Sequence, residues 1–198
     1  RTINALHTAF KTSRETPLLV LAGISGTGKS LLPRLYAESM GMHFLSVPVQ
    51  PRWDSPQDLL GFFNHMDGRY RATELLRALI QFDAYFRAPS DVEIERMGDQ
   101  MLLVMLDEMN LARVEYYFSE FLSRLETRRD VDLCNSASRR KVSIPLELGG
   151  ASTEQLAVTV DTNVLLVGTM NEDESTMTLS DKVIDRSAVM RFAPPKNL

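Results

Sequence analysis

Short runs of apolar residues divide the chain and predict the strands of a sheet. Residues 18–22 and 101–106 are apolar without a break, which is typical of strands buried on both faces of a parallel sheet. Residues 164–169 form a third, largely apolar run, whereas residues 43–49 alternate between apolar and polar positions. The pattern predicts an α/β domain built on a parallel sheet.

Apolar residues at helical spacing predict helices between these strands. Residues 2–13 and 73–87 both show this spacing, and a helix that follows residues 23–30 should end near Gly41. From Val114 onward one apolar stripe runs beside a polar face, so this helix is expected to bury one side. The stripe consists of Tyr117, Phe118, Phe121, Leu122 and Leu125.

Two stretches are predicted to add strand pairs to this pattern. An Asp-Gly pair lies between short aromatic arms, which predicts an inserted hairpin over about residues 60–72 with a two-residue turn. Residues 127–160 are predicted to form charged turns around a second strand pair, 141–148 with 157–160. We interpret both stretches as parts of one domain.

The segment after the first strand carries the pattern G-x-x-x-x-G-K-S. Its glycines allow a tight turn in which successive backbone N–H groups point at phosphate oxygens, and the following helix adds the positive end of its dipole. Lys29 is expected to reach the β- and γ-phosphates of a nucleotide, and the Ser30 hydroxyl to bind Mg²⁺. The predicted nucleotide-binding residues are Gly23, Ser25, Gly26, Thr27, Gly28, Lys29, Ser30 and Leu31.

Two carboxylates and an amide stand at the ends of later apolar strands. Asp107 and Glu108 follow residues 101–106 directly, and Asn171 ends the strand that begins at residue 164. Ligands of open α/β sheets bind outside the carboxyl ends of the strands, so these groups are expected to face the same crevice as the glycine-rich loop. Asp107 is predicted to hold Mg²⁺ through water, Glu108 to activate the attacking water, and Asn171 to position it. For Asn171 the alternative is a residue that merely caps a strand and opens a turn.

Arg186 follows a short helical stretch near the end of the chain. At the flank of a domain, such an arginine can reach the γ-phosphate held by a neighbouring subunit and stabilise the transition state with its fixed charge. We therefore include Arg186 among the predicted catalytic residues. The alternative is a surface ion pair with Asp185, which would contribute little.

Composition limits the classes that remain. The 198 residues are enough for one α/β domain with an inserted hairpin. A net charge of -4 and a pI near 5.4 give no overall attraction to nucleic acid or to anionic membranes. Cys134 is the single cysteine, which excludes an internal disulfide and favours a cytoplasmic location. No apolar stretch approaches the roughly 20 residues of a membrane span, and we expect an excised piece of a longer protein.

Taken together, these motifs resemble the AAA+ superfamily of P-loop NTPases. The glycine-rich loop, Asp-Glu-Met-Asn at 107–110, Gly-Thr-Met-Asn at 168–171 and Arg186 occur in the order typical of that superfamily. The runs at 107–112 and 182–186 further resemble the McrB type, the motor subunits of modification-dependent restriction systems. The inserted hairpin is similar to the helix-two insertion of a group that also holds MoxR-like and dynein-related modules.

The resemblance implies a three-layer α/β/α sandwich that forms one large subdomain over residues 1–198, with a helical lid expected after residue 193. It also implies Mg²⁺-dependent hydrolysis of ATP or GTP by a ring, expected to be a hexamer, which works on DNA in a restriction or defence system. A nuclease or adaptor subunit is expected as a partner, and no contact with a membrane is expected. MoxR-like remodelling of protein complexes is the alternative motor function. Well-known McrB proteins continue Met-Asn with Thr-Ala-Asp-Arg, whereas residues 172–175 read Glu-Asp-Glu-Ser, so the choice between ATP and GTP stays open.

Several features have two interpretations each. A group of basic residues can touch DNA or a partner subunit, or can be a solvated loop. The hairpin aromatics Phe62, Phe63 and Tyr70 can contact a pore or partner, or can pack the hairpin onto the domain. The basic residues are Arg128, Arg129, Arg139, Arg140 and Lys141, and Trp53 is expected to anchor the loop after the second strand.

Two other classes of protein compete with the motor. A nucleotide-binding scaffold without hydrolysis is one, but such a scaffold has no use for a water-activating carboxylate. A P-loop kinase would need an acceptor pocket that the sequence does not show.

Overall fold

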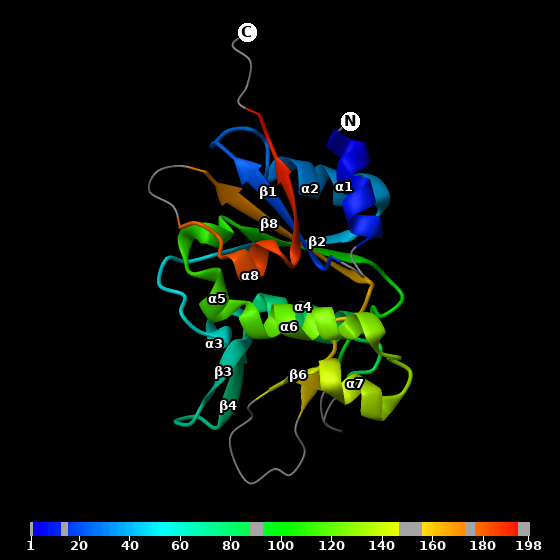
Figure 1. Ribbon diagram of the computed structural model, residues 1–198. Coiled ribbons are helices and arrows are strands. Elements are labelled where there is room, and N and C mark those ends of the chain that lie inside the picture. Colours follow the sequence, from blue (N-terminus) through cyan, green and yellow to red (C-terminus); the bar gives the residue numbers. More distant parts are fainter. Residues whose placement is uncertain (1, 13–15, 88–92, 147–155, 173–176, 194–198) are drawn as a thin grey trace.

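Five parallel strands form one central sheet in the computed structural model of the protein (Figure 1). The structure describes residues 2–12, 16–87, 93–146, 156–172 and 177–193. The strand order is β2-β5-β8-β1-β9, with bounds β1 Leu18–Gly23, β2 His43–Pro48, β5 Leu102–Asp107, β8 Val164–Asn171 and β9 Ser187–Arg191. The predicted α/β class with a parallel sheet is confirmed, and β9 is an additional strand that the sequence pattern did not predict.

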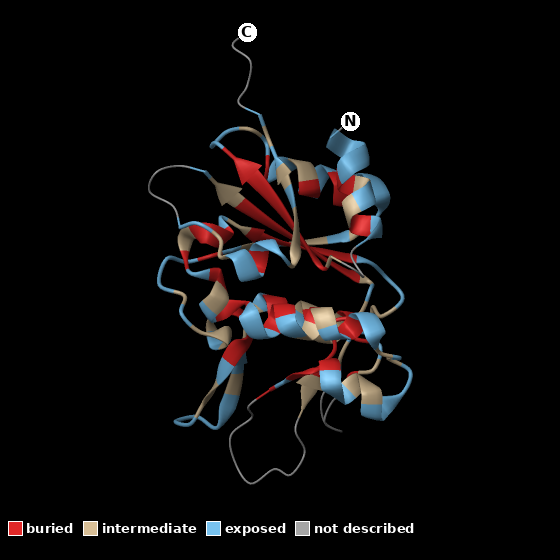
Figure 2. Cartoon of the chain, in the orientation of Figure 1, coloured by how far each residue is buried: buried red, intermediate tan, exposed pale blue. Residues whose placement is uncertain are grey.

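Helices cover both faces of this sheet and complete a three-layer sandwich. The first face is covered by α1 (Thr2–Lys11) and α2 (Leu31–Met40), and the second by α4 (Glu74–Phe82), α5 (Val114–Tyr117), α6 (Ser119–Thr127) and α8 (Asp181–Ile184). The inner strands β1, β5 and β8 bury almost every side chain, as their apolar sequences require (Figure 2). The core therefore lies on both sides of the three strands that also lead to the predicted site.

Two helix ends show how local sequence sets the boundaries. α2 ends as predicted at Gly41, which has a φ of 65° and donates its N–H back to the helix. α4 is shorter than the predicted 73–87 because it ends at Asp83, whose carboxylate accepts the N–H groups of Tyr85 and Thr159. Burial raises the pKa of Asp83 above its usual range, although these two bonds act in the opposite direction. Asp83 thus ties the end of α4 to a distant part of the chain.

The helix predicted from Val114 is divided into two helices. α5 ends at Phe118, where the backbone (φ -118°, ψ -9°) departs from helical geometry, and α6 begins directly after it. The predicted apolar stripe is nevertheless buried along its whole length. The Trp53 ring packs edge-on against Tyr117 at 5.3 Å, so Trp53 anchors the loop after β2.

The inserted hairpin is present, but its turn is longer than predicted. The elements are α3 (Pro56–Leu60), β3 (Gly61–Asn64) and β4 (Arg69–Ala72). Asn64 lies opposite Arg69, so residues 65–68 form a four-residue loop and the predicted two-residue turn is wrong. The Asn64 side chain accepts the Met66 N–H, and Gly68, with a φ of 66°, donates to the Asn64 carbonyl oxygen. These two local bonds close the longer loop.

The charged stretch after α6 contains a helix that the sequence pattern did not predict. α7 (Ser136–Val142) begins at Asn135, whose side-chain oxygen accepts two backbone N–H groups. The predicted strand over 141–148 is therefore wrong at its start, where the chain is still helical. The strand pair consists of β6 (Ile144–Pro145) and β7 (Ala157–Val158). Residues 147–155 lie outside the described residues.

Some expectations are left open by the fold. The single-subdomain boundaries at 1–198 and the lid after residue 193 stay predictions, and residues 194–198 lie outside the described part. None of the helices in the described ranges is both long enough and apolar enough to cross a membrane.

Candidate functional site

The strand order brings the predicted polar groups to one edge of the sheet. β8 lies between β1 and β5, with Asn171 opposite Gly23 and Gly168 opposite Leu106. Because the strands are parallel, their carboxyl ends meet where the glycine-rich loop leaves β1. This carboxyl edge therefore joins the loop to the last residues of β5 and β8.

The glycine-rich loop turns from β1 into α2 through two left-handed glycines. Gly26 and Gly28 have φ values of 78° and 83°, which residues with a Cβ rarely adopt. Lys29 is only 5% exposed, and its ammonium group donates to the carbonyl oxygens of Gly23 and Ile24. The loop thus holds a buried positive charge at the N-terminus of a helix, an arrangement that suits a phosphate anion.

The other predicted loop residues lie on the outer side of this turn. Ser25 and Ser30 are exposed, and the Thr27 hydroxyl donates to the Ile24 carbonyl oxygen over 2.9 Å. Leu31 begins α2 with its side chain 56% exposed. A contact between Leu31 and a phosphate would therefore use the backbone N–H, which belongs to the first turn of the helix.

Asp107, at the end of β5, accepts hydrogen bonds from two hydroxyl groups. Ser30 and Thr169 each donate to its Oδ1 atom over 2.7 Å, so the carboxylate joins the loop to β8. A hydroxyl and a carboxylate are hard oxygen ligands, which Mg²⁺ binds while water and phosphate fill its other positions. Within the described ranges, no group of three or more His, Cys, Asp or Glu could hold a metal by itself. Ser30 and Asp107 therefore fit a magnesium ion that arrives with phosphate.

Glu108 carries the second carboxylate of this edge. Its Oε1 accepts the Asn171 side-chain amide over 3.0 Å, and its backbone N–H donates to Thr169 Oγ1 over 2.9 Å. With a φ of 53°, Glu108 is the one non-glycine residue of the described chain in the left-handed region. Such backbone conformations cost about 1–3 kcal/mol and collect at functional sites. The structure thus places Glu108 and Asn171 in direct contact.

Thr169 is a member of the site that sequence reasoning missed. It is 1% exposed, donates to Asp107 and accepts from the Glu108 N–H, so one hydroxyl fixes both acidic residues relative to β8. The sequence offers one indication of this role, which is the position of Thr169 two residues before Asn171 on the same strand. The contact itself depends on the register between β5 and β8, which the sequence does not state.

A tyrosine supports the turn that follows Glu108. This turn is a 3-10 helix, η1 (Met109–Leu111), and the Tyr117 hydroxyl donates to the Met109 carbonyl oxygen over 2.8 Å. Burial raises the pKa of Tyr117 far above its usual range, and the charge of Glu115 acts in the same direction. The phenol therefore stays protonated and keeps this bond through the neutral and mildly alkaline range.

A cavity of about 470 Å³ opens beside Asn171. Its volume lies within the range of roughly 300–1,000 Å³ that is common for small-molecule sites. The lining residues come from β1, β8 and the residue after it, the segment before α8, α8 and β9. They are Ala22, Met170, Asn171, Glu172, Met177, Thr178, Leu179, Ile184, Val189 and Arg191. The polar cluster therefore borders a largely apolar hollow.

Comparison with known proteins is informative at the level of the fold. No family model and no curated protein matches the sequence. Among solved structures, the crystal structure of a "putative ATPase" from Cytophaga hutchinsonii matches with a TM-score of 0.52 over 98% of this chain. The two chains are 14% identical, and the match covers 47% of that protein, so this chain spans about half its length. The match shows that the two chains share a fold, the three-layer α/β/α sandwich.

Arg186 lies at the opposite edge of the central sheet, where the strands begin. It directly precedes β9, whose first residue, Ser187, lies opposite Leu18 at the amino end of β1. Arg186 therefore does not join the polar cluster of its own chain. Its guanidinium pairs with Glu126 on α6 at 3.0 Å, so the surface pair considered as an alternative is made with Glu126 and not with Asp185. The role of Arg186 in a neighbouring subunit stays a prediction.

The basic residues predicted as a patch do not all face solvent. Arg128, in the 3-10 turn η2 (Arg128–Asp130), is 3% exposed and donates to the carbonyl oxygens of Val160 and Asp161. Arg139, on α7, is half-buried and donates to the carbonyl oxygen of Leu133, which precedes this helix. Arg128 must therefore be removed from the predicted DNA-binding patch. The exposed members are Arg129, Arg140 and Lys141.

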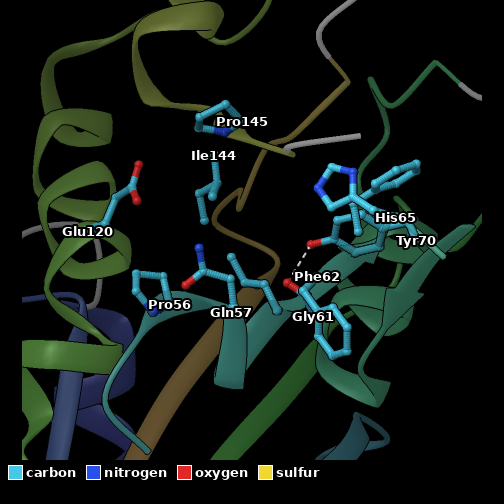
Figure 3. Close-up of a pocket in the computed structure, with 11 residues that line it drawn as sticks. Pro56, Gln57, Gly61, Phe62, His65, Tyr70, Glu120, Ile144 and Pro145 are labelled. Carbon is cyan, nitrogen blue, oxygen red and sulfur yellow. Dashed lines mark hydrogen bonds between the residues drawn. The ribbon is translucent and has the colours of Figure 1, made fainter. Parts of the chain in front are cut away.

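A second hollow, of about 380 Å³, lies away from the carboxyl edge, between the hairpin, α3, α6 and β6 (Figure 3). The Tyr70 hydroxyl donates to the Gly61 carbonyl oxygen over 2.9 Å, and the Phe63 ring packs edge-on against His65. These two aromatics pack within the hairpin. Phe62 is 54% exposed, so for Phe62 a contact with a pore or partner stays a prediction.

Proposed function

We propose that this chain is the catalytic core of an Mg²⁺-dependent enzyme that hydrolyses nucleoside triphosphates within an oligomeric motor of the AAA+ type. The observation that carries the proposal is the 3.0 Å contact between the Glu108 carboxylate and the Asn171 amide. It lies at the edge where the glycine-rich loop meets Asp107. A phosphate-binding loop serves many functions, but an oriented carboxylate beside a metal ligand suits the activation of water.

Each group of the cluster has a separate task in this proposal. The loop N–H groups and Lys29 bind the phosphates, and Ser30 with Asp107 would hold Mg²⁺, which offsets phosphate charge. Glu108 accepts a proton from the water whose oxygen bonds to the terminal phosphorus, while the bond from that phosphorus to the bridging oxygen breaks. Asn171 orients the water and the carboxylate.

The finer assignment rests on sequence resemblance. The runs at 107–112 and 182–186 support a McrB-like motor that works on DNA in a restriction or defence system, as a ring of six with a nuclease or adaptor subunit. ATP is the leading nucleotide and GTP the alternative. Arg140 and Lys141 are exposed and available for a local contact with DNA. MoxR-like remodelling of protein complexes is the alternative motor function.

Arg186 is proposed to complete the site of the next subunit. Its place at the far edge of the sheet and its side-chain exposure of 38% support a contact outside its own chain. In the full-length assembled protein, Arg186→Ala should slow hydrolysis by roughly 1,000-fold while each chain still binds nucleotide. Hydrolysis as fast as that of the wild type would remove Arg186 from the mechanism.

The test of hydrolysis is the isosteric change Glu108→Gln in the full-length assembled protein. Loss of the base should lower the rate of phosphate release by at least about 100-fold and leave nucleotide affinity within a few-fold, because Gln keeps the hydrogen bond with Asn171. The rate is measured as steady-state phosphate release with ATP and with GTP, and the affinity by equilibrium titration.

The matched control is Glu93→Gln, which removes an exposed carboxylate that takes no part in the hydrogen bonds of the cluster. This variant should hydrolyse at the wild-type rate. Equal rates for Glu108→Gln and the wild type would overturn the catalytic assignment. Tight nucleotide binding by a wild type that releases no phosphate would instead establish the non-hydrolysing scaffold.

A further inference from the structure

Asn110 is a buried amide to which the mechanism above gives no task. It lies in η1, two positions after Glu108, and is 1% exposed. Its Nδ2 donates to the Asn171 carbonyl oxygen over 2.8 Å and to the Met177 carbonyl oxygen over 3.2 Å. Its Oδ1 accepts the Asn171 N–H over 3.3 Å, and its backbone oxygen accepts the Met177 N–H over 3.3 Å. One residue therefore holds the backbone at both Asn171 and Met177.

An amide is the group that this set of partners requires. Two carbonyl oxygens need donors and one N–H needs an acceptor, and the Asn side chain supplies both kinds on adjacent atoms. A carboxylate at this position keeps the acceptor and loses the donors, and an apolar side chain loses all of them. Burial raises the cost of each bond left unmade. The side chain of Asn110 is thus matched to the backbone of Asn171.

The position of Asn171 relative to Glu108 is fixed from two sides. The Asn171 side chain donates to the Glu108 carboxylate, while the Asn171 backbone is held by Asn110. Glu108 and Asn110 belong to the same short turn, with Glu108 as its N-terminal cap. A shift of the Asn171 backbone would therefore change the contact between its amide and the carboxylate.

The segment beyond Met177 has its own attachment to the domain. The Ser180 N–H donates to Glu115 Oε1 over 3.2 Å, and Val183 on α8 is 3% exposed. Loss of the Asn110 amide should therefore loosen Asn171 without releasing α8.

The chain offers a matched control at the other end of β8. Asn163, directly before this strand, donates its Nδ2 to the carbonyl oxygens of Phe82, Gly98 and Gln100. Asn163 and Asn110 are the same residue type and make the same kind of bond. They differ in position, because Asn110 bonds to the backbone where β8 ends and Asn163 bonds to the backbone where β8 begins.

We propose that Asn110 is a positioning residue for hydrolysis. It fixes the backbone of Asn171 so that the Asn171 amide meets the Glu108 carboxylate and the attacking water in one geometry. This inference rests on the proposed function. Asn110 acts through Asn171 and contacts neither nucleotide nor water.

The kinetic test is a double-mutant cycle in the full-length assembled protein. Asn110→Ala should lower kcat at least about tenfold and leave KM within about threefold, since it acts on the chemical step. In the Asn171→Ala background the same change should cost no more than about twofold, because its target is gone. Asn163→Ala should keep kcat within about twofold even where it lowers thermal stability as much. Unchanged kcat in Asn110→Ala, or a full tenfold loss in both backgrounds, overturns the inference.

A second measurement separates this inference from the proposed function. Hydrogen exchange of the full-length protein without nucleotide should show faster exchange at the Asn171 N–H, whose acceptor is the Asn110 side chain, in Asn110→Ala and not in Asn163→Ala. Asn110→Asp keeps the side-chain volume and loses both donors, so it replaces Asn110→Ala in the kinetic test if Asn110→Ala does not fold. Unchanged exchange at the Asn171 N–H in folded Asn110→Ala overturns the role of Asn110. Absence of hydrolysis by the wild type overturns the proposed function, whatever the exchange rates are.

Discussion

Polar side chains form hydrogen bonds near both ends of β8, but they bond to different partners at the two edges of the sheet. At the carboxyl edge, Ser30, Asp107 and Thr169 bond to one another. At the amino edge, where the parallel strands begin, Asn163 and Arg128 donate to backbone carbonyl oxygens. A bond between side chains leaves groups that a ligand can take over, whereas a bond to the backbone of a distant segment fixes the path of the chain. The difference separates a candidate site from a structural attachment.

Two buried positive charges differ in how far along the sequence their bonds reach. Lys29 and Arg128 are both buried, at 5% and 3% exposure, and both donate to backbone carbonyl oxygens. Lys29 bonds to carbonyl oxygens of its own loop, so its ammonium can exchange a carbonyl for a phosphate without separating distant segments. Arg128 joins η2 to residues 160–161, across 32 and 33 residues of sequence, so it holds two distant segments together.

Among the changes that test the contrast between the two edges, the largest expected effect is on nucleotide binding, from Lys29→Ala. Loss of a charge-assisted contact with phosphate should weaken affinity roughly 100-fold. The measurement is an equilibrium titration with a fluorescent nucleotide and Mg²⁺. Lys141→Ala, which removes an exposed lysine of α7, is the control and should bind like the wild type. Equal affinities for all three proteins would contradict the assignment of the carboxyl edge.

At the amino edge, Arg128→Met should affect stability and not affinity. The change leaves the carbonyl groups of Val160 and Asp161 without their donor, which should lower the free energy of unfolding by about 2–4 kcal/mol. Chemical denaturation measures this loss. Arg129→Met, at an exposed neighbouring position, should change it by less than about 0.5 kcal/mol. A loss of nucleotide affinity in folded Arg128→Met would break the distinction between the two edges.

A smaller effect is expected from Thr169→Val, which keeps the shape of the side chain and removes the hydroxyl. Asp107 and Glu108 would lose their common partner, and the rate of hydrolysis by the assembled protein should fall about tenfold. Thr169→Ser restores the hydroxyl and should recover most of the rate. If Val and Ser variants hydrolyse equally, the hydroxyl does not organise the site.

The smallest effect is expected from Glu126→Ala, which removes the partner of Arg186. Both side chains of this pair are more than a third exposed, so the free energy of unfolding should change by less than about 1 kcal/mol. Nucleotide affinity should not change, because the pair lies at the amino edge. Thermal denaturation and the same nucleotide titration test both statements.

The sequence predicted the parts of the fold that local pattern determines. Apolar runs located β1, β5 and β8, because strands buried on both faces need apolar residues at every position. β9 escaped prediction because it is only partly buried, and its apolar run is limited to the three residues 188–190. α7 was missed because its seven residues are mostly polar and its start depends on the Asn135 cap.

The residues of the candidate site also divide into those that local sequence could identify and those that it could not. The glycine-rich loop, Asp107, Glu108 and Asn171 could be located because each stands at the end of a recognisable strand. The tasks of Thr169 and Asn110 could not be predicted, because both depend on contacts across 61 or 62 residues that only the assembled sheet brings together. The burial of Arg128 was hidden for the same reason, since its partners lie beyond the stretch that made it look like a surface residue.

Hydrogen exchange of the full-length protein with and without Mg²⁺ and nucleotide tests the central claim most directly. Binding at the carboxyl edge should slow exchange over residues 24–31 and 107–110, while the segments around Asn163 and Arg128 should exchange as before. Protection confined to the amino edge, or no protection at a nucleotide concentration that saturates binding, would contradict it.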